Sequence, residues 1–275
     1  TLDNADRFLD VTQNQRARFH PIGVVQGWSP ASMAEAARQL VKMGYDYLAL
    51  GGMVPLRSQQ IHEALDAIRA AIPADVRLHI LGFTKIDDWA QFERHGITSV
   101  DSTSPLIRAF KDGRNNYYSP QKDGSLRYFT ALRVPQALEN PKLMRLIKRG
   151  DFSGGDLVQL EQAALNALRA YDSGKCDVEE ALERLLDYAS VIEEGRTRRK
   201  DTPTLPIKRL RTVYRETLEQ NPWKTCPCAI CRSSGIEVAI FRASNRNKRR
   251  GSHNRAVVDD AIQRHKQGTI RACND

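Results

Sequence analysis

Three cysteines lie within six residues near the end of the chain and form its clearest chemical pattern. They are Cys226, Cys228 and Cys231, in the order C-P-C-x-x-C, and His253 follows them. Three thiolates and an imidazole form a ligand set that Zn²⁺ binds tetrahedrally, and a site filled by four protein ligands leaves no position for a catalytic water. The spacing therefore predicts a structural zinc site. The alternative is a group of buried free thiols.

An aspartate at the end of a short apolar segment is the second candidate. Asp101 closes the segment 98–101 and precedes the small polar residues Ser102, Thr103 and Ser104. A carboxylate that ends a buried strand is placed to attack an electrophile, and attack at an anomeric carbon forms a covalent glycosyl-enzyme intermediate. The alternative is a helix cap or a turn former.

Small and amide residues follow two other apolar segments. Gly51 and Gly52 allow the backbone to approach a flat ligand, so that a peptide N–H can reach a polar atom on its edge. Gln26 can donate and accept along a purine edge. The alternatives are a tight turn for the glycines and a solvent-facing amide for Gln26.

Positive charge is concentrated in the last third of the chain. Residues 196–275 carry 19 Lys+Arg and 7 Asp+Glu, a net charge of +12, whereas residues 1–195 carry 23 and 26, a net charge of −3. Such an excess is typical of proteins that dock on phosphates, although a solvated basic surface is the alternative. Four basic residues just before His253 are predicted to form a flexible basic loop that contacts phosphates: Arg246, Lys248, Arg249 and Arg250.

Residues 21–101 alternate short apolar segments with helical patterns. The predicted strands are 22–26, 47–50, 78–83 and 98–101, and the predicted helices are 32–43, 58–71 and 87–95. This spacing indicates an α/β fold with consecutive βα units on a parallel sheet, in a (β/α) barrel or a doubly wound sheet. The carboxyl ends of the strands form the active face in both folds. Four units cannot close an eight-stranded barrel.

The rest of the chain is predicted to be irregular over 102–140 and then helical. The predicted helices are 141–148, 155–171, 177–194 and 207–219. Their leucine stripes indicate core packing more than a partner groove.

Composition and cysteine usage limit the class of protein. The chain has 275 residues, of which 41% are hydrophobic, and it has neither a segment of about 18 apolar residues nor an N-terminal signal peptide. We therefore expect a cytoplasmic protein. Five cysteines are an odd number for a disulfide framework, so Cys176 and Cys273 are interpreted as ordinary cysteines. Cys273 and His265 are the downstream competitors of His253 as the fourth ligand.

Five motifs follow one another along the chain. They are Gly23-Val24-Val25-Gln26-Gly27, Leu48-Ala49-Leu50-Gly51-Gly52-Met53, Leu81-Gly82-Phe83-Thr84, Ser99-Val100-Asp101-Ser102-Thr103-Ser104-Pro105, and the C-x-C-x-x-C with His253-Asn254. Together they resemble the second half of the tRNA-guanine transglycosylase family. The resemblance implies the C-terminal half of a zinc-containing (β/α)8 TIM-type barrel and a glycosyltransferase that exchanges guanine for a 7-deazaguanine base. It implies that Asp101 is the nucleophile and that Gln26, Gly51, Gly52 and Met53 bind the base.

Two segments resemble one branch of this family in particular. The sequences QGWSP at 26–30 and RRGSHN at 249–254 are similar to the branch that places 7-deazaguanines in DNA, found with phage-defence and phage gene clusters. The target base must leave its stack before C1′ can meet Asp101, so we expect a flipped or single-stranded nucleotide as substrate. The alternative substrate is tRNA.

The chain also departs from the family pattern. Asp101 and Cys226 are 125 positions apart, so we predict three parts: a half-barrel at 1–105, an irregular segment and helical insert at 106–222, and a zinc-binding basic subdomain at 223–275. The family's other essential aspartates belong to a first half that is not found here, and we expect an N-terminal half or a partner chain to supply it. A non-catalytic nucleic-acid-binding subunit and a metabolic barrel enzyme with an unrelated zinc site are the alternatives.

Overall fold

The computed structural model describes residues 1–15, 18–83, 89–111, 113–195, 206–242 and 244–272. The chain forms two compact units, Thr1–Ser104 and Pro105–Asp275, which are described separately below. The finer division into a half-barrel, an insert and a zinc subdomain stays a prediction.

A four-stranded parallel sheet forms the centre of the first unit, as predicted. Its strands are β1 Gly23–Val25, β2 Tyr47–Leu50, β3 Arg77–Ile80 and β4 Ile97–Val100, in the spatial order β1-β2-β3-β4. The register places Val25, Leu50 and Ile80 side by side on one face. All three are fully buried, so this face carries the core of the unit.

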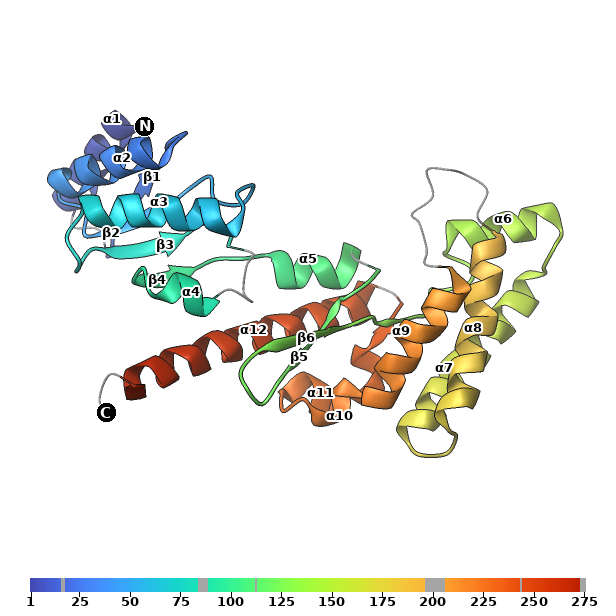
Figure 1. Cartoon of the computed structure of the whole chain (residues 1–275). Helices are drawn as coiled ribbons and strands as arrows, with labels where there is room; N and C mark the ends of the chain where they lie inside the picture. The colour runs from blue at the N-terminus through green and yellow to red at the C-terminus, as the bar shows by residue number, and fades with distance from the viewer. Residues whose placement is uncertain (16–17, 84–88, 112, 196–205, 243, 273–275) are drawn as a thin grey trace. The chain divides into compact units, whose positions relative to one another are not determined.

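The helices of the first unit are α1 Leu2–Asn14, α2 Pro30–Met43, α3 Ser58–Ala71 and α4 Trp89–Glu93. Figure 1 shows α2 and α3 side by side along the strands. Phe92 of α4 stacks on His62 of α3 with ring centroids 4.4 Å apart, which places α4 beside α3. Consecutive strands are therefore connected by helices that pack next to one another.

Sharp local signals fix the ends of α2. The side chains and backbones of Ser29 and Ser32 bond reciprocally in a capping box, and Pro30 begins the helix. Gly44 ends it with φ of 112°, a left-handed conformation that favours glycine.

The second unit begins with segments that the sequence does not reveal. The prediction of irregular structure over 102–140 is wrong in part, because this stretch contains α5 Ser104–Lys111, a hairpin of β5 Tyr117–Pro120 and β6 Leu126–Phe129, and β7 Leu132–Arg133. Strand β7 pairs in parallel with β8 Ile240–Phe241, more than a hundred residues later. Such a distant partner cannot be read from a local pattern.

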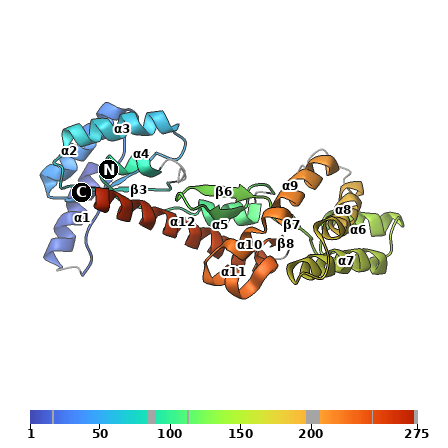
Figure 2. The same cartoon turned by 60° about the horizontal axis from the view of Figure 1, so that its bottom comes forward.

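The next four helices of the second unit follow the prediction closely, whereas the later ones are not predicted. Figure 2 shows these four helices gathered at one end of this unit, where α7 and α8 pack together. They are α6 Pro141–Arg149, α7 Gly154–Asp172, α8 Val178–Glu194 and α9 Ile207–Gln220, followed by α10 Pro222–Thr225, α11 Ala229–Ser234, the 3-10 helix η2 Gly235–Val238 and α12 Ser244–Ala272. None of the helices in the described part of the chain is long and apolar enough to cross a membrane.

Candidate active site and metal centre

Asp101 lies at the carboxyl edge of the sheet, immediately after β4. Its Oδ1 accepts a hydrogen bond from the backbone N–H of Gly82 at 2.7 Å and faces Nε2 of His79 at 3.3 Å. The side chain remains 59% exposed. The carboxylate is therefore held by one oxygen while it stays open to a ligand.

Gly82 can hold this position only as a glycine. Its φ is +68°, and a Cβ at this residue would lie 2.7 Å from Cγ2 of Val54. A side chain here would displace either Val54 or the N–H that binds Asp101.

The structure brings Gln26 and Gly51 together at the same edge. A Cβ on Gly51 would lie 3.5 Å from Cγ of Gln26, so the Gln26 side chain lies against this glycine. The N–H of Gly51 donates to the carbonyl of Val25 at 3.0 Å. Gly52 is exposed, with φ of +76° and open space where a side chain would be. The backbone that a flat ligand can approach is thus that of Gly52.

Two other residues near Gln26 and Gly52 differ in exposure. Met53 is only 2% exposed and belongs to the core, so the structure does not present it at the edge. Trp28 is 94% exposed, although the N–H of Trp28 bonds to the hydroxyl of Ser32 and fixes its backbone. The sequence alone assigns Trp28 no role, because the exposure of its ring depends on the fold.

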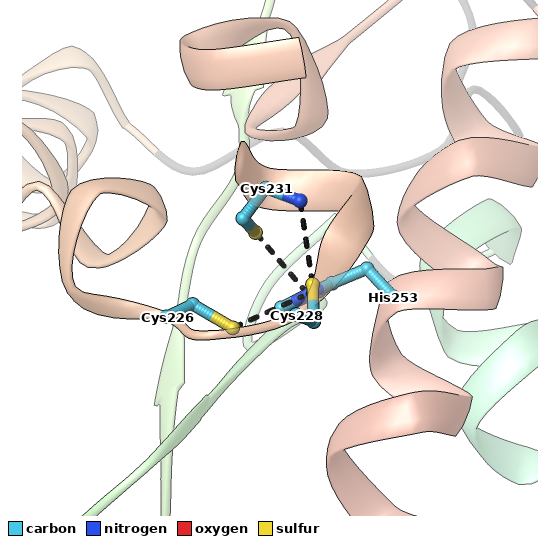
Figure 3. A group of neighbouring side chains, drawn as sticks. All are labelled: Cys226, Cys228, Cys231 and His253. Atoms are coloured by element: carbon cyan, nitrogen blue, oxygen red, sulfur yellow. Dashed lines mark hydrogen bonds between the residues drawn. The ribbon is translucent and has the colours of Figure 1, made fainter. Parts of the chain in front are cut away.

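The cysteines and His253 meet in the second unit as predicted from their spacing (Figure 3). Their ligand atoms all lie within 4.8 Å of one another, and Nδ1 of His253 is 3.3 Å from Sγ of Cys228 and 3.4 Å from Sγ of Cys231. Nε2 of His253 lies 2.8 Å from the carbonyl of Tyr118, which places the N–H on Nε2 and turns the lone pair of Nδ1 to the thiols. The four residues could hold a metal ion.

Hydrogen bonds within the cluster shift the pKa values of its thiols in opposite directions. A hydrogen bond from Cys231 lowers the pKa of the Cys226 thiol to about 4, and the same bond raises the pKa of Cys231 because the donor thiol retains its proton. Tyr117 packs against the cluster, with its hydroxyl 3.1 Å from Sγ of Cys231 and its ring stacked on that of His253. A metal ion would replace the proton that Cys226 and Cys231 share, so that all three thiols could ionise.

The basic residues before His253 require a correction. They lie in the long helix α12 rather than in a flexible loop, and His253 lies within the same helix. Arg250 is fully buried, and its guanidinium donates to three backbone carbonyls and to Asn247, so it cannot contact phosphates.

Of the other three basic residues, one is already paired. Nε of Arg246 donates to Glu237 at 2.6 Å, and its side chain is 25% exposed. Lys248 and Arg249 are exposed on α12. These two are the members of the set that remain accessible to an anionic partner.

Known proteins are similar to this chain over segments of different length. The chain is 40% identical over 263 residues to a DNA-guanine transglycosylase of Salmonella montevideo, a match that covers 96% of this chain and 60% of that protein. It is 32% identical over 106 residues to a queuine tRNA-ribosyltransferase of Haemophilus influenzae, which covers 38% of this chain and 27% of that protein. A queuine tRNA-ribosyltransferase of Psychrobacter cryohalolentis is 26% identical over 114 residues. No protein-family model matches the chain.

Proposed function

Because this chain belongs to the tRNA-guanine transglycosylase family, we propose that it is the nucleophile-bearing part of an enzyme that exchanges guanine for a 7-deazaguanine base in DNA. The observation that carries the proposal is the geometry of Asp101, whose exposed carboxylate is held at the carboxyl edge of a parallel sheet. The chain spans about 60% of the length of its DNA-guanine transglycosylase relative.

The exchange consists of two displacements at C1′ of the target nucleotide. An oxygen of Asp101 bonds to C1′ while the C1′–N9 bond to guanine breaks, and the electron pair goes to the leaving base, which takes a proton from a general acid. N9 of the incoming base then gives its proton to a general base and bonds to C1′ while the C1′–O bond breaks, and the electron pair returns to the Asp101 carboxylate. Two displacements preserve the configuration of the sugar.

Gln26 and the backbone of Gly52 are the groups that we assign to the base. The Gln26 amide can pair with a purine edge, and the open glycine permits a flat ring to lie against the main chain. Trp28, exposed nearby in the sequence, offers a surface on which a nucleobase can stack.

The topology of the sheet supports half of a (β/α)8 barrel. A doubly wound sheet reverses its strand order at a switch point and carries helices on both faces, whereas the order here is sequential and α2, α3 and α4 lie next to one another. We propose that strands from an N-terminal half or from a partner chain complete the barrel and supply the general acid and base. Four strands alone would leave the inner face open.

We assign Zn²⁺ to the cluster of Cys226, Cys228, Cys231 and His253. Three thiols and one imidazole match its preference, and four protein ligands make the site structural. When bound, the ion holds α11 against α12. The chemistry at C1′ takes place at Asp101, in the other unit.

The choice of DNA as the substrate rests on the relatives, and tRNA is the alternative. The match to a DNA-guanine transglycosylase covers most of this chain, whereas the matches to queuine tRNA-ribosyltransferases cover about two fifths of it. DNA is therefore the proposed substrate and tRNA the second candidate.

Incorporation of labelled guanine tests both parts of the proposal. The chain, together with the remainder of its barrel, is offered DNA and tRNA in the same reaction with radiolabelled guanine. Label in DNA supports the proposal. Label in tRNA alone would contradict the choice of DNA, and label in neither would contradict the exchange activity.

A further inference from the structure

A histidine lies within strand β3, between two fully buried residues. His79 lies between Leu78 and Ile80, which are fully buried on the helix-covered face, while the side chain of His79 is 15% exposed on the opposite face. A polar ring at this depth requires partners. The register places it in one row with Val24, Ala49 and Ser99, next to the edge that carries Asp101.

His79 links Asp101 to a chain of hydroxyl groups. Nδ1 of His79 bonds to Oγ of Ser99, and Oγ of Ser99 bonds in turn to the hydroxyl of Tyr47. Nε2 of His79 faces Oδ1 of Asp101 at 3.3 Å. The guanidinium of Arg77 lies over the Tyr47 ring, 4.6 Å from its centroid, at the far end of the chain.

The proton positions in this chain follow from Asp101. An ionised carboxylate only accepts hydrogen bonds, so Nε2 of a neutral His79 must carry the proton. Nδ1 is then an acceptor, Ser99 donates to it, and Tyr47 donates to Ser99. The hydroxyl groups thus select the tautomer that faces the carboxylate.

We propose that His79 is a positioning residue for the nucleophile, an inference that rests on the proposed function. Together with the N–H of Gly82, it places two donors on Oδ1 of Asp101. Within the described part of the chain, both contacts of the carboxylate use Oδ1, so Oδ2 is the oxygen that attacks C1′. Two donors on one oxygen fix the plane of the carboxylate before substrate binds.

Two substitutions of His79 distinguish the effect of its N–H donor from the effect of its ring. His79→Phe keeps a ring but removes the N–H, and we expect the single-turnover rate of base exchange to fall on the order of 10–100-fold with unchanged nucleic-acid affinity. His79→Gln keeps an N–H at a similar reach and should restore most of the rate. A His79→Phe rate equal to that of the wild type, or a His79→Gln rate as low as that of His79→Phe, would overturn the proposal.

A second measurement needs no substrate. Long-range ¹H–¹⁵N correlation spectra of the neutral imidazole report which ring nitrogen carries the proton. We expect the Nε2–H tautomer in the wild type and a mixture of tautomers in Ser99→Ala. A wild-type ring protonated at Nδ1 would overturn the role of His79. Base exchange by Asp101→Asn would instead refute the proposed function, so the two failures are distinguishable.

Discussion

Arg250 is a charged residue that is fully buried in the second unit. Its guanidinium donates to the carbonyls of Ala109, Val238 and Ile240, at 2.7, 3.4 and 3.1 Å. Burial lowers the pKa of Arg250 to about 9, so the group is still protonated at neutral pH. The residue connects α12 to α5 and β8 rather than to a phosphate.

Replacing Arg250 should therefore affect stability. Arg250→Met leaves these carbonyls without a donor, and we expect the free energy of unfolding to fall by about 2–4 kcal/mol. Urea unfolding followed by circular dichroism measures the change. Lys248→Met, two residues away and exposed, is the control and should stay within about 0.5 kcal/mol of the wild type. Equal stability of both variants would show that the buried network contributes nothing.

Residue type reveals some site residues in the sequence and hides others. The thiols of the zinc pattern are conspicuous because three cysteines within six residues seldom occur by chance. His79 is one of two polar residues in the short strand β3, and nothing local indicates that it faces Asp101 at the end of the neighbouring strand β4. Trp28 and Arg250 have opposite exposures, 94% and 0%, that composition cannot tell apart.

Helix α12 shows why elements are harder to predict where long-range contacts decide them. Asn, Ser and Gly are frequent in 244–254, and these residues favour turns. The helix forms there because Arg250, His253 and Asn254 occupy one buried face, and each bonds to distant backbone. The strands of the first unit were predictable because their apolar runs and helix stop signals are local.

The proposed zinc site of Cys226, Cys228, Cys231 and His253 contacts three elements, so loss of the metal should affect all of them. Cys228→Ser should reduce the zinc content well below one ion per chain and increase amide exchange in α11, α12 and β5, because His253 also binds the β5 carbonyl of Tyr118. Native mass spectrometry and hydrogen exchange measure the two effects. Cys176→Ser, outside the cluster, is the control. Full zinc occupancy in Cys228→Ser would refute the assigned ligand set.

At the scale of the whole molecule, we expect the exposed positive charge to make DNA binding weaken as the salt concentration rises. Lys248 and Arg249 are exposed, and each phosphate contact contributes about one unit to the slope of log affinity against log salt. Lys248→Ala with Arg249→Ala should reduce the slope for DNA by about two. Arg246→Ala should change it less, since Arg246 is already paired with Glu237. A slope that the double variant leaves unchanged would make these residues a solvated surface.

The two units carry different groups of candidate functional residues. Asp101 and the glycines assigned to the base in the proposal belong to the first unit, and the Cys226, Cys228, Cys231 and His253 cluster and the exposed cations of α12 belong to the second. The proposal that another half completes a barrel follows from the family resemblance and from the strand number, because four parallel strands are too few to close a barrel.

The covalent bond between Asp101 and C1′ is the step whose detection tests the proposed exchange most closely. The chain, completed by the rest of its barrel, is incubated with labelled DNA without an incoming base and separated on a denaturing gel. We expect a shifted band of enzyme bound to DNA for the wild type and none for Asp101→Asn, whose amide cannot act as the nucleophile. Zinc content and DNA affinity should be unchanged in the variant. A covalent band with Asp101→Asn would place the nucleophile elsewhere and refute the role of Asp101.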